Sequence, residues 1–177
     1  MASDNFTRAN ESPIASPWAV PTGFGTMKLA SNAVTATTAS TDSACRYTLS
    51  TATDSQVTIG TVGSSDGGPA IFDASGNGYS ANGAGGNISV LRFAGGAFSA
   101  TIGSTAGSWA SGNTVRIRRV GNTLVVSING ADVLTSASDT TYMTGNPAIH
   151  NFDGTETVTA WTDNVAPTDV IIGQACL

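Results

Sequence analysis

Few residues in this chain could carry out catalysis, and their spacing favours no known reaction. His150 is the single histidine, so Ser-His-Asp or Cys-His catalysis would have to use it. It lies in "NPAIHNF", which is predicted to be a strand, and we find neither a serine nucleophile elbow nor the context of an activated cysteine. We therefore expect His150 to be structural.

The carboxylates do not form a pattern typical of glycoside hydrolysis. That reaction needs two carboxyl groups about 5–9 Å apart. The chain has two glutamates, Glu11 and Glu156, and no predicted strand carries carboxylates at i, i+2 and i+4 on one face. We expect no catalytic residues and no enzymatic activity.

The sequence also offers no pattern for a metal or a cofactor. Cys45 and Cys176 are far apart and match no zinc-binding spacing; either they are unlinked thiols, or a disulfide ties the C-terminus to strand 43–50. The glycine-rich segment 73–87 is predicted to be a loop. It lacks the alternating carboxylates of a calcium loop and the motif of a phosphate-binding loop.

Composition excludes several classes of partner. Charged residues make up 11% of the 177 residues and the net charge is −5, whereas nucleic-acid binding needs a basic stripe. No apolar run approaches the roughly 18 residues that span a bilayer. The N-terminal segment has no secretion-signal pattern, so we expect synthesis and folding in a cytoplasm and a neutral, polar surface.

Alternation of apolar and polar residues recurs along the chain and favours strands over helices. Turn residues separate the candidate strands at spacings typical of an all-β sandwich. We expect a single domain over 1–166 and a C-terminal tail over 167–177 that docks on a neighbour. The candidate strands are 44–50, 56–62, 69–73, 88–93, 97–102, 114–120, 123–128, 131–135, 147–151 and 156–165.

Two stretches predict hairpins with a defined register. In "LRFAGGAF" a Gly-Gly turn would set Phe93 opposite Phe98 and Leu91 opposite Ala100, and the aromatic pair is expected in the core.

In "VRIRRVGNTLVVSINGADVL", residues 115–134, two tight turns would set Ile117 opposite Val126 and Val126 opposite Val133. One face of these three strands must then point into the sandwich.

The opposite face of residues 115–134 is a candidate contact surface. It is expected to carry Arg116, Arg118, Val125 and Leu134 beside Val120, Ser127 and Asp132. This surface is either an ordinary solvated face with scattered apolar residues or an interface with arginines beside an apolar centre. Tyr79 and Trp109, in polar turn-like settings, are candidate platforms for stacking a sugar, although each could equally be core.

The N-terminal residues carry a resemblance to a known family. "DNFTRANESPIASPWAV" resembles the first strand and loop of concanavalin A-like (laminin-G-like) domains, at Asp4, Phe6, Arg8 and Trp18. "MKLASNAV" at 27–34 looks like the strand that follows, and 115–165 is similar again. The resemblance implies an all-β fold of two antiparallel sheets in a jelly-roll sandwich. The glucanase branch's Glu-x-Asp-x-x-Glu strand and the lectin branch's calcium cluster have no counterpart here.

Domains of this kind with little charge and no signal peptide look like surface proteins of tailed bacteriophages. We therefore expect a non-enzymatic virion protein, most of all a capsid decoration protein that oligomerises and contacts the major capsid protein or other virion proteins. The alternative is a carbohydrate-binding adhesin that recognises host glycans through Trp109 or Tyr79.

Overall fold

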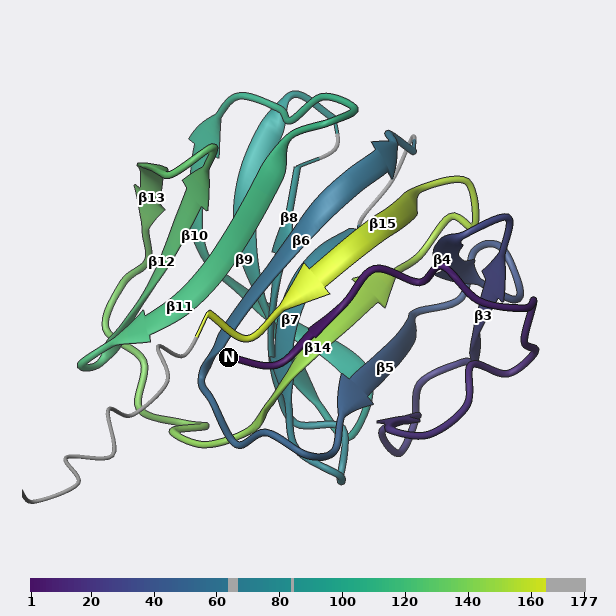
Figure 1. The fold of residues 1–177 in the computed structure, drawn as a ribbon. Helices are drawn as coiled ribbons and strands as arrows, with labels where there is room; N and C mark the ends of the chain where they lie inside the picture. Colours follow the sequence, from purple (N-terminus) through teal and green to yellow (C-terminus); the bar gives the residue numbers. More distant parts are fainter. Residues whose placement is uncertain (64–66, 84, 165–177) are drawn as a thin grey trace, which may run out of the picture.

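The computed structural model describes residues 1–63, 67–83 and 85–164, and every regular element in them is a strand (Figure 1). No helix in these ranges has the length and apolar character to cross a membrane. The strands form two antiparallel sheets packed face to face. The predicted tail over 167–177 and the predicted docking of that tail lie outside the described residues.

Sheet A has eight strands. Its order is β13-β12-β11-β6-β15-β4-β3, with β1 beside β15. The strands are β13 (Ala131–Thr135), β12 (Thr123–Ile128), β11 (Thr114–Val120), β6 (Asp54–Thr61), β15 (Thr157–Thr162), β4 (Ala33–Ala36), β3 (Met27–Ala30) and β1 (Ser3–Asp4).

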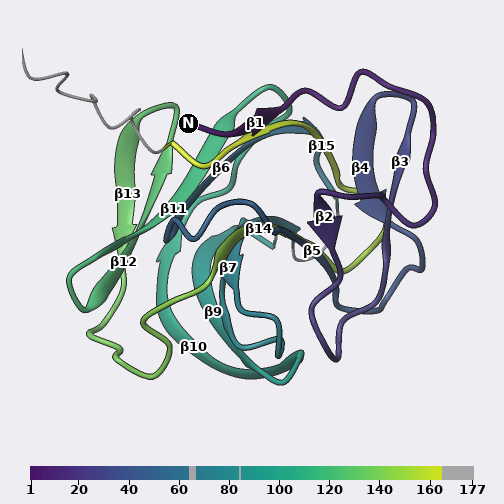
Figure 2. The same cartoon turned by 60° about the horizontal axis from the view of Figure 1, so that its bottom comes forward.

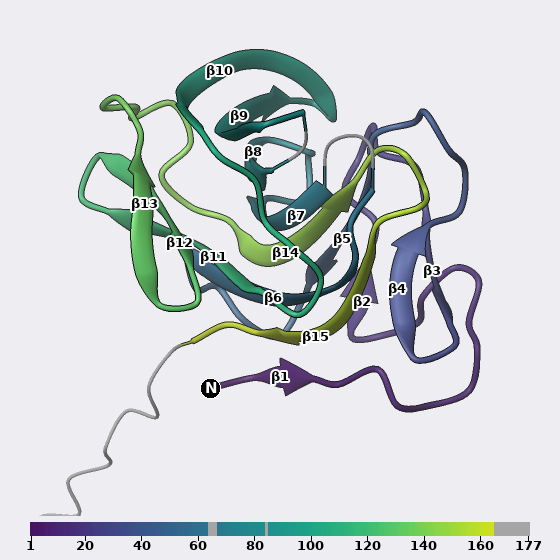
Figure 3. The same cartoon turned by 90° about the horizontal axis from the view of Figure 1, so that it is seen from above.

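Sheet B has seven strands in the order β10-β9-β8-β7-β14-β5-β2. It is rolled, so that the face turned away from sheet A is concave (Figures 2 and 3). The strands are β10 (Ala97–Ala106), β9 (Asn87–Ala94), β8 (Gly78–Asn82), β7 (Gly67–Phe72), β14 (Asn146–Asn151), β5 (Ser43–Tyr47) and β2 (Trp18–Ala19).

The predicted all-β sandwich is confirmed, and each of the ten predicted strands has a counterpart in the structure. The predicted loop over 73–87 is wrong in its middle, where β8 pairs with β7 on one side and β9 on the other. Its small residues hid the alternation, in which Tyr79 and Ala81 face the core between the sheets.

The core between the sheets contains the residues on which the family resemblance rests. Phe6 and Trp18 are buried, and their rings lie 5.8 Å apart. The carboxylate of Asp4 accepts two hydrogen bonds from Arg8 at 2.8 Å and one from the Trp18 indole at 2.9 Å. Trp161 packs edge-on against Trp18. These four N-terminal positions therefore close one end of the core.

The predicted hairpin at Gly95-Gly96 forms, with a different register after its first pair. Phe93 does lie opposite Phe98, but a bulge then sets Leu91 opposite Thr101 instead of Ala100. Phe98 is 55% exposed, so only Phe93 belongs to the core.

In the second stretch the pairing of Ile117 with Val126 is confirmed. The pairing of Val126 with Val133 is wrong, because a bulge in β13 sets Leu134 opposite Val126. A one-residue bulge reverses which side chains face the core.

A second apolar cluster fills the concave face of sheet B. Phe24, from the segment after β2, lies over this face with its ring 4.6 Å from Phe72 and 5.4 Å from Phe93. The segment approaches closely enough that a Cβ at Gly23 would lie 2.0 Å from the carbonyl oxygen of Gly95. The concave face is thus occupied by the chain itself.

His150 lies beneath Phe24 and is fully buried. Its Nδ1 is 3.2 Å from the hydroxyl of Ser80 and its Nε2 is 3.0 Å from a carboxylate oxygen of Asp42. In a Ser-His-Asp triad the serine faces Nε2 and the aspartate faces Nδ1. These two contacts are exchanged relative to that triad, and Ser80 is fully buried as well. The three side chains therefore link β8, β14 and the residue before β5.

Candidate functional site

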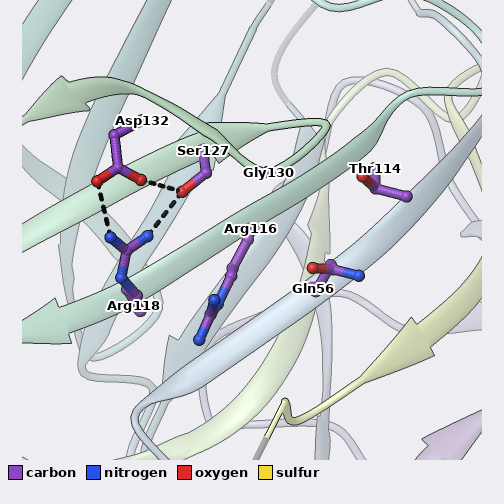
Figure 4. Close-up of a pocket in the computed structure, with 7 residues that line it drawn as sticks. All are labelled: Gln56, Thr114, Arg116, Arg118, Ser127, Gly130 and Asp132. Atoms are coloured by element: carbon purple, nitrogen blue, oxygen red, sulfur yellow. Dashed lines mark hydrogen bonds and ion pairs between the residues drawn. The ribbon is translucent and has the colours of Figure 1, made fainter.

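An open depression lies on the outer face of sheet A. It has a volume of about 420 Å³ and spans four adjacent strands from β13 to β6. Figure 4 shows its lining side chains projecting from these strands and from the β12–β13 turn. They are Gln56, Thr114, Arg116, Arg118, Ser127, Gly130 and Asp132.

Strand register places four of these residues in one line. Asp132 is the register partner of Ser127, Ser127 of Arg116, and Arg116 of Gln56. Direct partners on one face of a sheet have their Cβ atoms about 5 Å apart. This polar row (Asp132, Ser127, Arg116 and Gln56) therefore crosses the strands. It presents carboxylate, guanidinium and amide groups, while the hydroxyl of Ser127, which is 3% exposed, joins Arg118 to Asp132.

Both arginines of the depression are held in ion pairs. Arg116 donates two N–H groups to the carboxylate of Asp54. Arg118 donates to Asp132 at 2.8 Å and to the Ser127 hydroxyl at 2.6 Å. The hydrogen bonds from Arg118 and Ser127 lower the pKa of Asp132 to about 2. Asp132 is therefore ionised at any ordinary pH.

The two arginines and Asp132 provide fixed donors and acceptors that are partly open to solvent. Each guanidinium has five N–H donors, of which its protein partners use two. The carboxylates accept bonds on more than one lone pair. Neighbouring hydroxyl groups on one molecule could therefore donate to a carboxylate and accept from an arginine at the same time.

Of the predicted contact residues, Arg116 and Arg118 line the depression, while Val125 and Leu134 do not. Val125 is on the outer face, opposite Arg118, yet only 6% exposed. Leu134 points inward and packs against the core because of the bulge in β13. Val125 and Leu134 therefore do not form the predicted exposed apolar centre, although Val120 of the same surface is 51% exposed.

Tyr79 is not a surface platform, because β8 turns its side chain into the core, where it is 1% exposed. Its hydroxyl donates to Asp139 at 2.9 Å and accepts from the backbone N–H of Tyr142 at 3.1 Å. The Arg119 guanidinium lies 5.1 Å from the ring centroid. Burial raises the pKa of Tyr79. The predicted role of Tyr79 as a sugar contact is wrong.

Trp109 is likewise buried, at 3% exposure. A Cβ at Gly83 would lie 2.2 Å from the indole, and one at Gly68 would lie 3.1 Å from it. The two glycines therefore make room for the ring, and Trp109 cannot stack on a ligand. Its prediction as a sugar platform is wrong for the same reason as that of Tyr79.

Asp139 makes the stability of the folded state depend on pH. Burial alone would raise its pKa, but hydrogen bonds from Thr141 and Tyr79 and the nearby charge of Arg92 lower it to about 2. The pKa in the unfolded chain is near 3.8, so ionised Asp139 stabilises the folded state above about pH 4. That contribution is lost as the pH falls towards 2.

We expect Asp139→Asn to flatten the acid limb of the stability profile. Between pH 5 and pH 2, titration of Asp139 should lower the free energy of unfolding of the wild type by about 2 kcal/mol. The variant should have a lower free energy of unfolding at pH 5 and lose less of it as the pH falls. Urea unfolding at a series of pH values measures the difference. Parallel profiles for the two proteins would contradict the assigned role of Asp139.

The sequence did not single out Gln56 or Asp54, which β6 brings beside β11. The two strands are about 60 residues apart in the chain, and only their pairing sets Gln56 opposite Arg116. The available signal was the alternation in "DSQVTIGT", which sets Asp54, Gln56 and Thr58 on one face of the strand.

Two other predicted features fall partly outside the described residues. Cys45 is buried, and burial raises the pKa of its thiol. Cys176 lies outside the described residues, so the two predicted alternatives, unlinked thiols or a disulfide, stay open. In the described ranges, no group of three or more histidine, cysteine, aspartate or glutamate side chains is placed to hold a metal ion.

Neither a protein-family model nor a curated protein sequence matches this chain. Solved structures do resemble it. The carbohydrate-binding module CBM66 from Bacillus subtilis aligns with 81% of this chain and 91% of its own, at a TM-score of 0.63 and 16% identity. The Emp46p carbohydrate recognition domain aligns with 92% of this chain and 96% of its own, at a TM-score of 0.53 and 14% identity.

A β-1,3-1,4-glucanase (lichenase) derived from a mouse hindgut metagenome aligns over 92% of this chain and 95% of its own, at a TM-score of 0.56 and 10% identity. The fold is the concanavalin A-like jelly roll. This confirms the family resemblance of the N-terminal and 115–165 segments at the level of fold. At such identities the concanavalin A-like jelly roll leaves activity open, and the likeness does not bear on the predicted virion role.

Proposed function

We propose that the protein is a non-enzymatic carbohydrate-binding protein and that it binds a neutral glycan in the depression on sheet A. The observation that carries the proposal is the polar row, in which Asp132, Ser127, Arg116 and Gln56 stand side by side on adjacent strands. A sugar presents hydroxyl groups that both donate and accept hydrogen bonds, and the row offers matching groups at fixed spacing.

The charges of the depression favour a neutral ligand. The positive charges of Arg116 and Arg118 are balanced by Asp54 and Asp132, so the site has no surplus positive charge for an acidic sugar. The chain as a whole carries −5. An anionic glycan would therefore gain little at the site and be repelled by the rest of the protein.

The state of the carboxylates supports binding without catalysis. Glycoside cleavage needs a carboxylic acid that donates a proton to the leaving oxygen, and its pKa is usually raised. Asp132 has a pKa of about 2 and stays ionised, and Asp54 is held by Arg116. Asp132 is therefore not suited to act as the acid.

Two further findings support the proposal. CBM66 and the Emp46p domain are named for carbohydrate binding, and they share the fold of this chain. Phe24 covers the concave face of sheet B at Phe72 and Phe93, whereas the depression on the outer face of sheet A is open. Capsid decoration and homo-oligomerisation stay predictions from the sequence.

A glycan array that contains neutral and acidic sugars tests the proposal. We expect neutral glycans to bind and uronate or sialylated glycans to give weaker signals. Affinity for a neutral hit should change less than about twofold between 0.1 M and 1 M salt, because no net charge is neutralised on binding. An array without any neutral hit, or a preference for acidic glycans that salt abolishes, would overturn the proposal.

A further inference from the structure

A second depression lies on sheet A at β1 and β15, and β15 is the neighbour of β6. It has a volume of about 340 Å³ and is lined by Ser3, Asp4 and Asn5 around β1 and by Ala160 and Trp161 of β15. We infer that the two depressions are successive subsites of one groove and that the ligand is an oligosaccharide chain lying across the strands. This inference rests on the proposed function.

Strand register continues the polar row into the second depression. Gln56, at the end of the row, is the register partner of Thr162 in β15, and Thr162 is the partner of Ser3 in β1. β6 and β15 are neighbours in sheet A, so no strand separates the two depressions. The extended row therefore passes through Asp132, Ser127, Arg116, Gln56, Thr162 and Ser3. At its centre, Asn164 donates to the Gln56 side chain at 2.9 Å and to the Thr162 hydroxyl at 3.1 Å.

The length of the extended row exceeds what a single sugar needs. Six residues on six adjacent strands span five intervals of about 4.8 Å, which is about 24 Å before the twist of the sheet is considered. Every residue of the extended row is polar. A ligand that contacts both ends must be a chain of several sugars whose axis is roughly perpendicular to the strands.

The two ends of the extended row differ in chemistry. The first depression has two arginine–aspartate pairs. In the second, Ser3 is exposed and Ala160 is half-buried, whereas Asp4 is engaged by Arg8 and Trp18 and is set to hold β1 in place. We therefore assign orientation and most of the affinity to the first depression, and recognition of further sugars to the second.

Binding of oligosaccharide series tests the inference. The probes are laminari-oligosaccharides, malto-oligosaccharides and inulin-type fructo-oligosaccharides, each from the monosaccharide to the hexasaccharide, titrated calorimetrically against the full chain. For the series that binds, we expect the hexasaccharide to bind about tenfold more tightly than the disaccharide.

Two variants separate the subsites. Ala160→Trp fills the second depression, and Thr162→Val removes a hydroxyl from the extended row at nearly constant shape. Both should reduce the gain from chain length and leave disaccharide affinity as in the wild type. Thr162→Val preserves the test if Ala160→Trp does not fold.

The outcomes distinguish the inference from the proposed function. Equal affinity for disaccharide and hexasaccharide, or a gain from length that both folded variants retain, would overturn the second subsite and leave carbohydrate binding intact. A wild-type protein that binds no member of any series and no neutral glycan on the array would overturn both.

Discussion

Replacing Trp109 with alanine should lower the free energy of unfolding by about 4 kcal/mol and leave glycan affinity unchanged. The ring is buried in the core against Gly68 and Gly83, and truncation of a buried aromatic side chain removes its transfer free energy and leaves a cavity. Chemical denaturation measures the first effect, and titration at a temperature at which the variant is folded measures the second.

Trp109→Phe is the matched control. It keeps most of the buried ring and removes an indole N–H that finds no acceptor among the described residues, so its cost should be below that of alanine, about 1–2 kcal/mol. A folded Trp109→Ala protein with near wild-type stability and no glycan binding would show that Trp109 is a ligand platform. That result would overturn its assignment to the core.

Replacing Arg118 with lysine should weaken binding of a neutral glycan by about tenfold, or about 1.4 kcal/mol. Lysine keeps the charge, but it loses the planar fork that bonds Ser127 and Asp132 while presenting further donors. Arg116→Lys should act in the same direction, because Arg116 occupies the centre of the polar row.

Arg92→Lys provides the comparison for these two variants. Arg92 also pairs with a carboxylate, that of Asp139 at 2.9 Å, but it belongs to β9 in sheet B. The same substitution there should leave glycan affinity unchanged in folded protein. Equal losses from Arg92→Lys and Arg118→Lys would mean that the depression is not the binding site.

The sequence was sufficient to predict the β-sandwich and the outward orientation of Arg116 and Arg118. Alternation and tight turns correctly predicted the β11–β12 pairing, in which Ile117 faces Val126 and the arginines point outward. The predictions of side-chain orientation failed where the alternation of apolar and polar residues is broken or hidden. A bulge in β13 turned Leu134 inward, and a glycine-rich stretch concealed β8 and with it the burial of Tyr79.

The polar row could not be predicted from the sequence, because it is made by pairing between distant segments. Gln56 and Thr162 are more than 100 residues apart, and Ser3 lies at the other end of the chain. Side-chain type alone was also misleading, since the aromatic residues in polar contexts, Tyr79 and Trp109, proved to be core. The candidate site depends on hydrogen-bonding groups that become a set only in the folded sheet.

The central claim is that a neutral glycan binds across the outer face of sheet A, and amide chemical-shift mapping tests it most directly. The isotope-labelled protein would be titrated with the tightest-binding hexasaccharide of the three series. We predict that the largest shifts lie along β13, β12, β11 and β6 at Asp132, Ser127, Arg116 and Gln56, and continue to Thr162 and Ser3. Shifts concentrated on sheet B around Phe24 and Phe98, with the polar row unmoved, would contradict the claim.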